Sequence, residues 1–415
     1  MKIKVILSIA LLICLGIGVN SCETSVDSTI SSVSGKIYNY RVIPSSNLKV
    51  TVQNQTVYTS SNGSFAFDNV IYPYDLIVTD SSFRSTVYIY KGLSVKNITI
   101  PLNRSQSSTD LAFVYVHLPE GLFQSDLMCK IIFTDGNYIN RYVQVSDLNQ
   151  DVYFDVPLNG NNSVSGRLFV LTYKSDSENR ILSYENFGQS PEIQLHSGST
   201  FEYTFDSQSL SVNPGEQEIE CSFNNISQDD LSFFYISFSQ KYTFNETNFV
   251  FSELHGSSVS FKIPTGIPAE FKTFVNNYSY NIPGDAAEDF NVIPNVLNEF
   301  TVKVPPDLVS PDNEIQNVNN NTQFSFNTGT GNGIYEISLF NNVSFIEYKI
   351  ITSNNNFTLE GLEELEFGNF SNNNFNWNVK KIGPANSMND FITDFFNKQN
   401  HFFSQSTNRY FSTEP

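Results

Sequence analysis

The segment Asn62-Gly63-Ser64-Phe65-Ala66-Phe67 decides the fold class of this chain of 415 residues. Asn and Gly both tolerate positive φ, so the first two residues predict a tight turn between two strands. Before the turn, apolar and polar residues alternate through Leu48-Lys49-Val50-Thr51-Val52, and Val57 and Thr59 begin the partner strand of a hairpin. The two Phe residues alternate again after the turn. A period of two places every second side chain on one face. The segment therefore predicts an antiparallel sheet with one buried face.

The same alternation extends on both sides of this hairpin. Val33-Ser34-Gly35-Lys36-Ile37 precedes it, and Tyr74-Asp75-Leu76-Ile77-Val78 follows it. With the Asn-Gly turn and its two Phe residues, these stretches resemble the carboxypeptidase regulatory-like family, a small transthyretin-like β-sandwich. The resemblance covers residues 33–102, with Ile71-Tyr72-Pro73 where the family usually has Pro-Gly. It implies a scaffold module without zinc ligands or peptidase chemistry.

Two stretches in the middle of the chain follow a common pattern. Each contains an alternating strand that stops at a proline, which cannot donate a hydrogen bond to a sheet. We predict two related β-sandwiches, at residues 103–207 and 208–304, although unrelated sandwiches can also contain a strand that ends in proline. The matching segments are Val152-x-Phe154-x-Val156-Pro157, 168–173 and 200–205 in the first stretch, and Val259-x-Phe261-x-Ile263-Pro264, 271–275 and 299–304 in the second.

The last part of the chain, residues 305–415, begins after a stiff hinge at Val304-Pro305-Pro306. Its motifs resemble a fibronectin type III or related Ig-like domain of bacterial surface proteins. Phe326 stands where that family usually has its first Trp, and Trp377 occupies the later Trp position; we expect both in the core. The motifs are Ser310-Pro311, Asn317-Val318, Thr322-x-Phe324-x-Phe326, Phe375-x-Trp377-x-Val379 and 409–413.

An insertion near residues 387–400 precedes the last strand of this domain. Ile392, Phe395, Phe396 and Gln399 have the spacing of one helix face. The insertion therefore predicts one short helix in an otherwise all-β chain.

The N-terminus predicts export. Lys2 and Lys4 precede an apolar run from residue 5 to residue 19, which is typical of a secretory signal and too short to span a membrane as a helix. The run ends at Val19-Asn20-Ser21-Cys22, which resembles a bacterial lipobox. This resemblance implies a signal peptide at 1–21, lipidation of Cys22, a flexible tether at 22–32, and anchoring to a bacterial membrane, either the outer membrane or the cell surface. An ordinary secretory signal with an incidental cysteine is the alternative.

The overall composition excludes some classes of partner and cross-link. The chain has 42 acidic and 23 basic residues, and its net charge of −19 argues against a nucleic-acid partner. After removal of the signal and acylation of Cys22, only Cys129 and Cys221 remain. We expect two separate buried thiols rather than a disulfide.

The sequence shows no catalytic or metal-binding motif. His117, His196, His255 and His401 are scattered without metal-ligand spacing, so we expect no metal, no cofactor and no enzyme activity. The acidic groups are expected in loops, as solvated surface charge. Calcium at module junctions, with Asp312, Asp285 and Asp289 as ligands, is a weaker alternative. The acidic groups are Asp285-Glu288-Asp289, Asp229-Asp230 and Glu360-Glu363-Glu364-Glu366.

These patterns predict an all-β chain of tandem β-sandwich modules after a lipoprotein signal peptide. We expect independent modules that form a rod, with the C-terminal module outermost. The predicted function is a non-catalytic surface or periplasmic lipoprotein for binding, adhesion or scaffolding. The alternative is a carbohydrate-binding or carbohydrate-active exported protein. Phe233-Phe234-Tyr235 and Phe402-Phe403 break the alternation, so they could bind a glycan or another surface protein, or else cover a neighbouring module.

Overall fold

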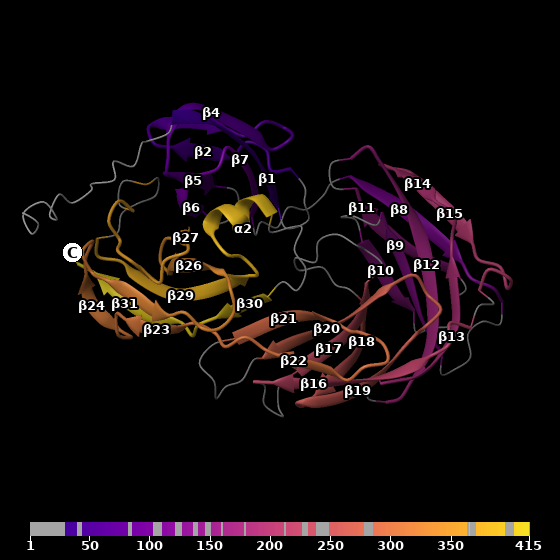
Figure 1. The fold of residues 1–415 in the computed structure, drawn as a ribbon. Coiled ribbons are helices and arrows are strands. Elements are labelled where there is room, and N and C mark those ends of the chain that lie inside the picture. Colours follow the sequence, from indigo (N-terminus) through magenta and orange to yellow (C-terminus); the bar gives the residue numbers. More distant parts are fainter. Residues whose placement is uncertain are drawn as a thin grey trace, which may run out of the picture.

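The fold of the chain is almost entirely β-strand, with one short helix among the residues described, α2 (Met388–Asp394) (Figure 1). The predicted all-β fold is therefore confirmed. The described part of the chain contains no helix that is long and apolar enough to cross a membrane. The computed structural model describes residues 30–39, 44–81, 85–102, 110–120, 127–135, 140–145, 151–158, 161–177, 180–210, 213–225, 231–237, 249–277, 285–362, 365, 371–394 and 402–414.

Module 1, the first of four groups of strands, is a sandwich of two sheets. Its strands are β1 (Ile30–Asn39), β2 (Lys49–Val52), β3 (Gln55–Tyr58), β4 (Ser64–Ile71), β5 (Tyr74–Asp80), β6 (Thr86–Leu93) and β7 (Asn97–Leu102). In one sheet, β1 lies between antiparallel β4 and parallel β7. The other sheet has the order β3-β2-β5-β6. Val50 and Phe67 lie in the common core, as their alternation predicted.

Module 2 contains the first of the two related middle stretches. Its strands are β8 (Leu111–His117), β9 (Leu127–Thr134), β10 (Asn140–Val145), β11 (Asp151–Pro157), β12 (Ser163–Ser175), β13 (Ile181–Gln189), β14 (Ile193–His196) and β15 (Thr200–Thr204). One sheet has the order β11-β8-β15, and the other has the order β10-β9-β12-β13, with β14 also paired to β12.

Module 3 repeats this topology. Its strands are β16 (Gln217–Asn224), β17 (Leu231–Ser237), β18 (Phe249–His255), β19 (Ser258–Ile263), β20 (Glu270–Asn277), β21 (Asp285–Asn291) and β22 (Asn298–Thr301). The sheets are β19-β16-β22 and β18-β17-β20-β21. In modules 2 and 3 alike, the first strand is antiparallel to the fourth and parallel to the last.

Modules 1, 2 and 3 thus have the same strand order, whereas the repeat of two related sandwiches stays a prediction. The proline-terminated motifs are the equivalent strands β11 and β19, and in module 1 the corresponding strand is β4. Sequence comparison within the chain predicted only two copies, because module 1 lacks the terminal proline in this strand. The limits of the modules stay predictions.

Module 4 has a different topology. Its strands are β23 (Asp307–Ser310), β24 (Ile315–Val318), β25 (Phe324–Asn327), β26 (Ile334–Asn341), β27 (Glu347–Thr352), β28 (Asn356–Phe357), β29 (Asn374–Gly383), β30 (Phe402–Gln405) and β31 (Arg409–Thr413). One sheet is β23-β25-β28, and the other contains β27, β26 and β29, with β29 paired to both β30 and β31. Trp377 and Phe326 are buried between these sheets, which confirms the prediction that they are core residues.

The modules are not separate units on a rod, so that expectation is wrong. Strand β27 of module 4 pairs in parallel with β6 of module 1, and β30 pairs with β21 of module 3. The second sheets of modules 1, 3 and 4 therefore form one sheet of 14 strands. Modules 2 and 3 share a core that includes Phe187 and Phe261. The order of contact is 1, 4, 3, 2, along the arc in Figure 1, so the C-terminal module is not outermost.

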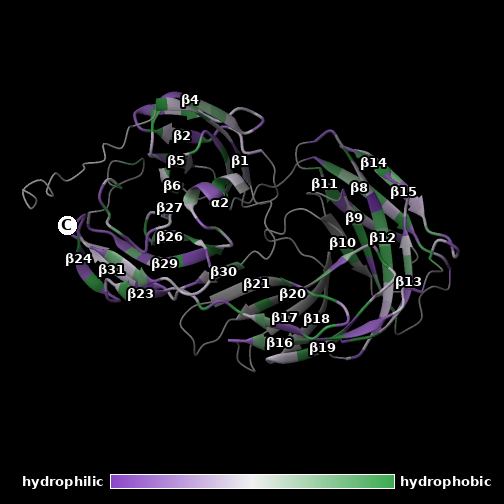
Figure 2. Cartoon of the chain, in the orientation of Figure 1, coloured by the Kyte–Doolittle hydropathy of each residue, from purple (hydrophilic) through white to green (hydrophobic). Residues whose placement is uncertain are grey.

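Helix α2 contributes to the contact between modules 1 and 4. Met388, Phe391 and Ile392 belong to the core of module 1, together with Tyr90 and Leu93 of β6. The predicted insertion therefore does contain a helix, but it serves the neighbouring module as well as its own. Phe395, Phe396 and Gln399 lie outside the described residues. Figure 2 shows that hydrophobic and hydrophilic residues alternate along many of the strands that build these cores.

Candidate functional site

The predicted lipidation site, Cys22, lies outside the described residues, so acylation stays a prediction. Cys129 and Cys221 are free and buried, in β9 of module 2 and β16 of module 3. Burial raises the pKa of each thiol to about 12. Both side chains are therefore protonated at neutral pH and act as small apolar groups.

One acidic group does not lie in a loop, contrary to expectation. Asp285, Glu288 and Asp289 belong to strand β21, and Glu288 is buried. Its Oε1 atom lies 2.9 Å from Nζ of Lys303. A buried carboxylate requires such a partner, which the sequence spacing does not reveal.

The remaining acidic groups give little support to a metal site. Glu360 follows β28 in a turn, whereas Asp229-Asp230 and Glu363, Glu364 and Glu366 lie outside the described residues. Among the residues that the structure describes, no group of three or more His, Cys, Asp or Glu side chains could hold a metal ion.

The two aromatic runs singled out in the sequence lie in strands that touch other strands on both sides. Phe233-Phe234-Tyr235 is part of β17, where the pairing with β18 shifts register between Phe234 and Tyr235. Phe402 is buried, and Nζ of Lys380 lies 4.4 Å from the ring centre of Phe403. Strand β30 pairs with β21 of module 3, and Nζ of Lys303 in module 3 lies 5.7 Å from the ring centre of Phe402, so Phe402 contacts the neighbouring module, as one of the two alternatives expects.

A different set of aromatic residues faces outward from module 2. Ala112, Val114 and Val116 of β8 point into the core. The residues between them, Phe113, Tyr115 and His117, therefore point to the opposite side of the sheet, where each is partly exposed. On the adjacent strand β11, Tyr153 faces the same side and is 53% exposed. We call these four residues the aromatic face.

The rings of the aromatic face contact one another across the strands. Tyr115 and Tyr153 are direct partners in the register, with ring centres 5.6 Å apart. The rings of Phe113 and Tyr153 are 5.8 Å apart, with planes inclined by only 12°. Tyr115 and His117 are 5.4 Å apart. Such cross-strand contacts hold the rings in place on a rigid sheet.

Acidic side chains border the aromatic face. Oδ1 of Asp151 lies 2.7 Å from Nδ1 of His117, and the two residues are opposite each other in the register. Asp155, opposite Phe113, faces the same side from β11. On the other flank, Glu202 of β15 is exposed next to Tyr115. No outward-facing residue of β8, β11 or β15 is Lys or Arg, so the face is acidic and aromatic.

The equivalent face of module 3 has no aromatic residue on its two corresponding strands. Strands β8 and β16, and strands β11 and β19, can be matched through their registers, in which Val152 corresponds to Val259. Tyr153 then corresponds to Ser260, and Tyr115 to Glu220. The outward residues of β16 and β19 are Glu218, Glu220, Ser222, Asn224, Ser258, Ser260 and Lys262. The aromatic rings of module 2 are therefore not a requirement of the topology.

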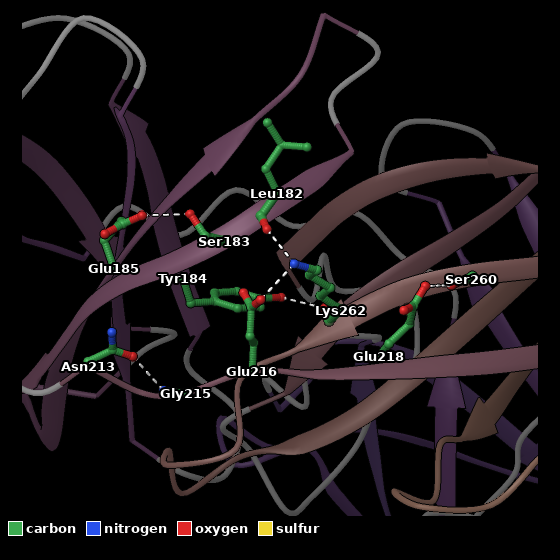
Figure 3. A network of polar contacts seen from close by, with 10 residues as sticks. All are labelled: Leu182, Ser183, Tyr184, Glu185, Asn213, Gly215, Glu216, Glu218, Ser260 and Lys262. Carbon is green, nitrogen blue, oxygen red and sulfur yellow. Dashed lines mark hydrogen bonds and ion pairs between the residues drawn. The ribbon is translucent and has the colours of Figure 1, made fainter.

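The face in module 3 is partly used for contact with module 2 (Figure 3). Nζ of Lys262 donates to the carbonyl oxygen of Leu182 in β13, at 2.7 Å, and lies 2.6 Å from Oε1 of Glu216. The hydroxyl of Tyr184 donates to the carbonyl oxygen of Lys262, at 2.8 Å. These contacts connect the two modules by polar groups around their shared core.

A second polar cluster lies where modules 1 and 4 meet. Nζ of Lys349 in β27 is 3.2 Å from Oε1 of Glu336 and 3.6 Å from Oε1 of Glu347. It also lies 5.9 Å from the ring centre of Tyr88 in β6. Burial opposes the charge of Lys349, but the two carboxylates raise its pKa above the ordinary value. Burial likewise opposes the charge of Glu336, yet Lys349 and Lys380 lower the pKa of this carboxyl.

The aromatic face was not predicted from the sequence, because the criterion of broken alternation selects only consecutive aromatic residues. The segment Phe113-Val114-Tyr115-Val116-His117 instead alternates between aliphatic and aromatic residues. In a strand of a two-layer sandwich, one of these two sets must face outward. The absence of small polar residues in that set is the signal that could have identified the face.

Comparisons with known proteins give no family assignment. No family model matches the chain, and no curated protein matches it. Among solved structures, the Bacillus anthracis TIE protein matches at 11% identity and a TM-score of 0.17, covering 66% of this chain. This chain covers 49% of that protein, about half its length.

Two pilin structures match at similar levels. The shaft pilin SpaA of Lactobacillus rhamnosus GG (D295N mutant) has 8% identity and a TM-score of 0.15, with 43% of this chain and 98% of that chain covered. BcpA, the major pilin subunit of Bacillus cereus, has 9% identity and a TM-score of 0.15, with 66% and 99% covered. These TM-scores are too low to inform the function of this chain.

Proposed function

We propose that this chain is a non-catalytic, exported scaffold protein that is anchored to a bacterial membrane through acylated Cys22. In this proposal it acts at the outer membrane or cell surface, where its modules hold a binding face for another surface component. The single observation that best supports it is the joining of modules 1, 3 and 4 in one sheet of 14 strands.

The arrangement of charged groups at the contacts between modules supports the same proposal. Lys349 interacts with Glu336 at the contact between modules 1 and 4, and Lys303 interacts with Glu288 in module 3, close to Phe402 of module 4. Lys262 connects modules 2 and 3. These charged groups have structural partners, as expected in a protein whose role depends on fixed module geometry.

Labelling of the mature N-terminus tests the proposal. The full chain, with its signal, is expressed in a bacterium in the presence of an alkyne-bearing fatty acid, and the N-terminal peptide is analysed by mass spectrometry. We expect a diacylglyceryl or triacyl modification on Cys22, and none in Cys22→Ser. Protease treatment of intact cells then tests surface exposure. A mature N-terminus other than Cys22, or a free Cys22 amine without diacylglycerol, would contradict the anchoring.

Carbohydrate binding is the second candidate function, and a specific observation favours it. The aromatic face of module 2 presents partly exposed rings beside carboxylates on one side of a sheet. This observation concerns binding only and gives no support to a carbohydrate-active enzyme.

A further inference from the structure

We infer that the aromatic face of module 2 binds a neutral carbohydrate chain, through stacking on Tyr153, Phe113 and Tyr115 and through hydrogen bonds to Asp151 and its neighbours. The inference deepens the proposed function, on which it rests for its biological setting, by naming the ligand class. The binding itself is a property of the folded chain and can be measured independently of anchoring.

The exposure of the rings argues that they serve a ligand rather than the core. The buried side of β8 and β11 already supplies Val114, Val116 and Phe154 to the core. Module 3 folds with the same topology and with Ser260 in the place of Tyr153. The rings therefore add apolar surface that the fold does not need, and exposed apolar surface of this kind marks binding sites.

The charge around the rings restricts the ligand. Asp151 and Glu202 border the face, and none of the outward residues on the three strands is Lys or Arg. This field repels phosphate, sulfate and carboxylate groups, so it disfavours nucleic acids, anionic lipids and acidic polysaccharides. It favours a ligand that donates hydrogen bonds, because an ionised carboxylate can only accept them.

A neutral carbohydrate satisfies both requirements. Its hydroxyl groups can donate to Asp151, Asp155 and Glu202, while the C–H faces of its rings can pack on the aromatic side chains. A strand rises about 3.3 Å per residue, so Phe113 and His117 are ~13 Å apart along β8. This length accommodates a short oligosaccharide rather than a single sugar. The contact between His117 and Asp151 fixes the carboxylate at one end of the face.

The test uses the mature full-length chain with Cys22→Ser, which removes the lipid. The protein is run in native gels that contain mannan, β-glucan or galactan, with a gel without polysaccharide as reference. Gels with heparin, and pull-down with poly-lysine, represent acidic polysaccharides and basic proteins. Titration calorimetry with a hexasaccharide of whichever neutral polymer retards the chain then gives the Kd.

The central variant is Tyr153→Ser, which introduces the residue that module 3 has at the equivalent position. Tyr58→Ser is the matched control, because Tyr58 is a similarly exposed tyrosine on β3 of module 1. We expect at least one neutral polysaccharide to retard the chain, Tyr153→Ser to raise the Kd about tenfold, and Tyr58→Ser to leave it within about twofold. Asp151→Asn is a second variant at the face, for use if Tyr153→Ser fails to fold by circular dichroism, and we expect it also to weaken binding.

Three outcomes would overturn the inference: no retardation by any neutral polysaccharide, equal binding by Tyr153→Ser, or binding to heparin or poly-lysine alone. If Cys22 is acylated in cells but the purified chain shows one of these outcomes, only the ligand assignment fails. If the chain binds the polysaccharide but Cys22 is not acylated, only the anchoring fails.

Discussion

At the scale of single residues, the most informative side chains are lysines that the sequence does not distinguish from surface lysines. Lys349 has a side chain that is only 11% exposed, next to two carboxylates at the contact between modules 1 and 4. By contrast, Lys91 pairs with Asp75 at a site where both side chains are more than 40% exposed. The two pairs have similar chemistry but different solvation, so their contributions to stability should differ.

We predict that Lys349→Met destabilises the protein by about 3 kcal/mol, because it leaves Glu336 buried without its main partner. Lys91→Met is the control and should cost at most about 1 kcal/mol, since exposed ion pairs contribute little. Urea unfolding at pH 7 measures both changes. Equal losses for the two variants would contradict a structural role of the buried pair.

The pH dependence of the Lys349→Met effect has a defined sign. The pKa of Glu336 is lowered in the folded protein, so its contribution is present above the ordinary carboxyl pKa and is lost as the pH falls through the lowered value. Protonation also relieves the unpaired charge in the variant. The difference in the free energy of unfolding between wild type and Lys349→Met should therefore decrease as the pH falls.

Replacement of Lys130 in module 2 by Met should have the opposite effect on stability to that of Lys349→Met. Burial lowers the pKa of Lys130 to about 7, next to Tyr173, whose ring centre is 5.9 Å from Nζ. The unfolded chain holds this proton up to its ordinary pKa, so wild-type stability should rise between pH 7 and about 10.5. We predict that Lys130→Met stabilises the protein at pH 7 by up to about 4 kcal/mol, and that the gain shrinks as the pH rises. A gain that is constant over this range in thermal unfolding experiments would contradict this explanation.

At the scale of elements, helix α2 connects a local insertion to a distant module. Phe391 is 5% exposed and packs in the core of module 1, whereas Phe345, in the turn between β26 and β27, is 60% exposed. The backbone amide of Ser94 also donates to Oδ1 of Asn389, at 3.0 Å. The helix therefore stabilises module 1 from outside that module's own sequence.

We predict that Phe391→Ala lowers the free energy of unfolding by about 3–4 kcal/mol, because it leaves a cavity in the core. Phe345→Ala should change it by less than about 0.5 kcal/mol. Circular dichroism during urea unfolding measures both. A similar loss for the two variants would show that α2 is not packed as described.

The strands were predictable from sequence because their signals are local. The Asn62-Gly63 turn, Pro157 at the end of β11 and the alternation in β4 each act over a few residues. The pairing of β6 with β27 could not be predicted in this way, since an edge strand has the same alternation as a strand that pairs on both sides. The burial of Glu288 in β21 was not predictable from local signals either. Its partner Lys303 is distant in sequence and lies just after the end of strand β22.

At the scale of the whole molecule, modules 1 and 4 are joined by strands that are far apart in the sequence but adjacent in one sheet. Tyr348, Ile350 and Ile351 of β27 lie opposite residues of β6 in a parallel register. Module 2 lies at the other end of the order of contact: among the described residues its strands pair with no strand of another module, and it shares a core with module 3.

We predict that a chain truncated after residue 304 loses protection of the β6 amides by at least about tenfold in hydrogen exchange, because β6 then becomes an exposed edge with fewer packed neighbours. Amides of β9 in module 2 should keep their protection and serve as the internal control. Mass spectrometry of peptides measures both strands. Unchanged protection of β6 would mean that module 1 does not depend on module 4.

The parallel pairing of β6 with β27 has a consequence for biosynthesis. A ribosome completes β6 well before β27, so the edge of module 1 at β6 stays uncovered while modules 2 and 3 are made. Uncovered strands of this kind recruit other chains into aggregates. A polypeptide whose translation stops before β27 would therefore keep β6 as an unpaired edge strand, which distinguishes it from the full-length chain.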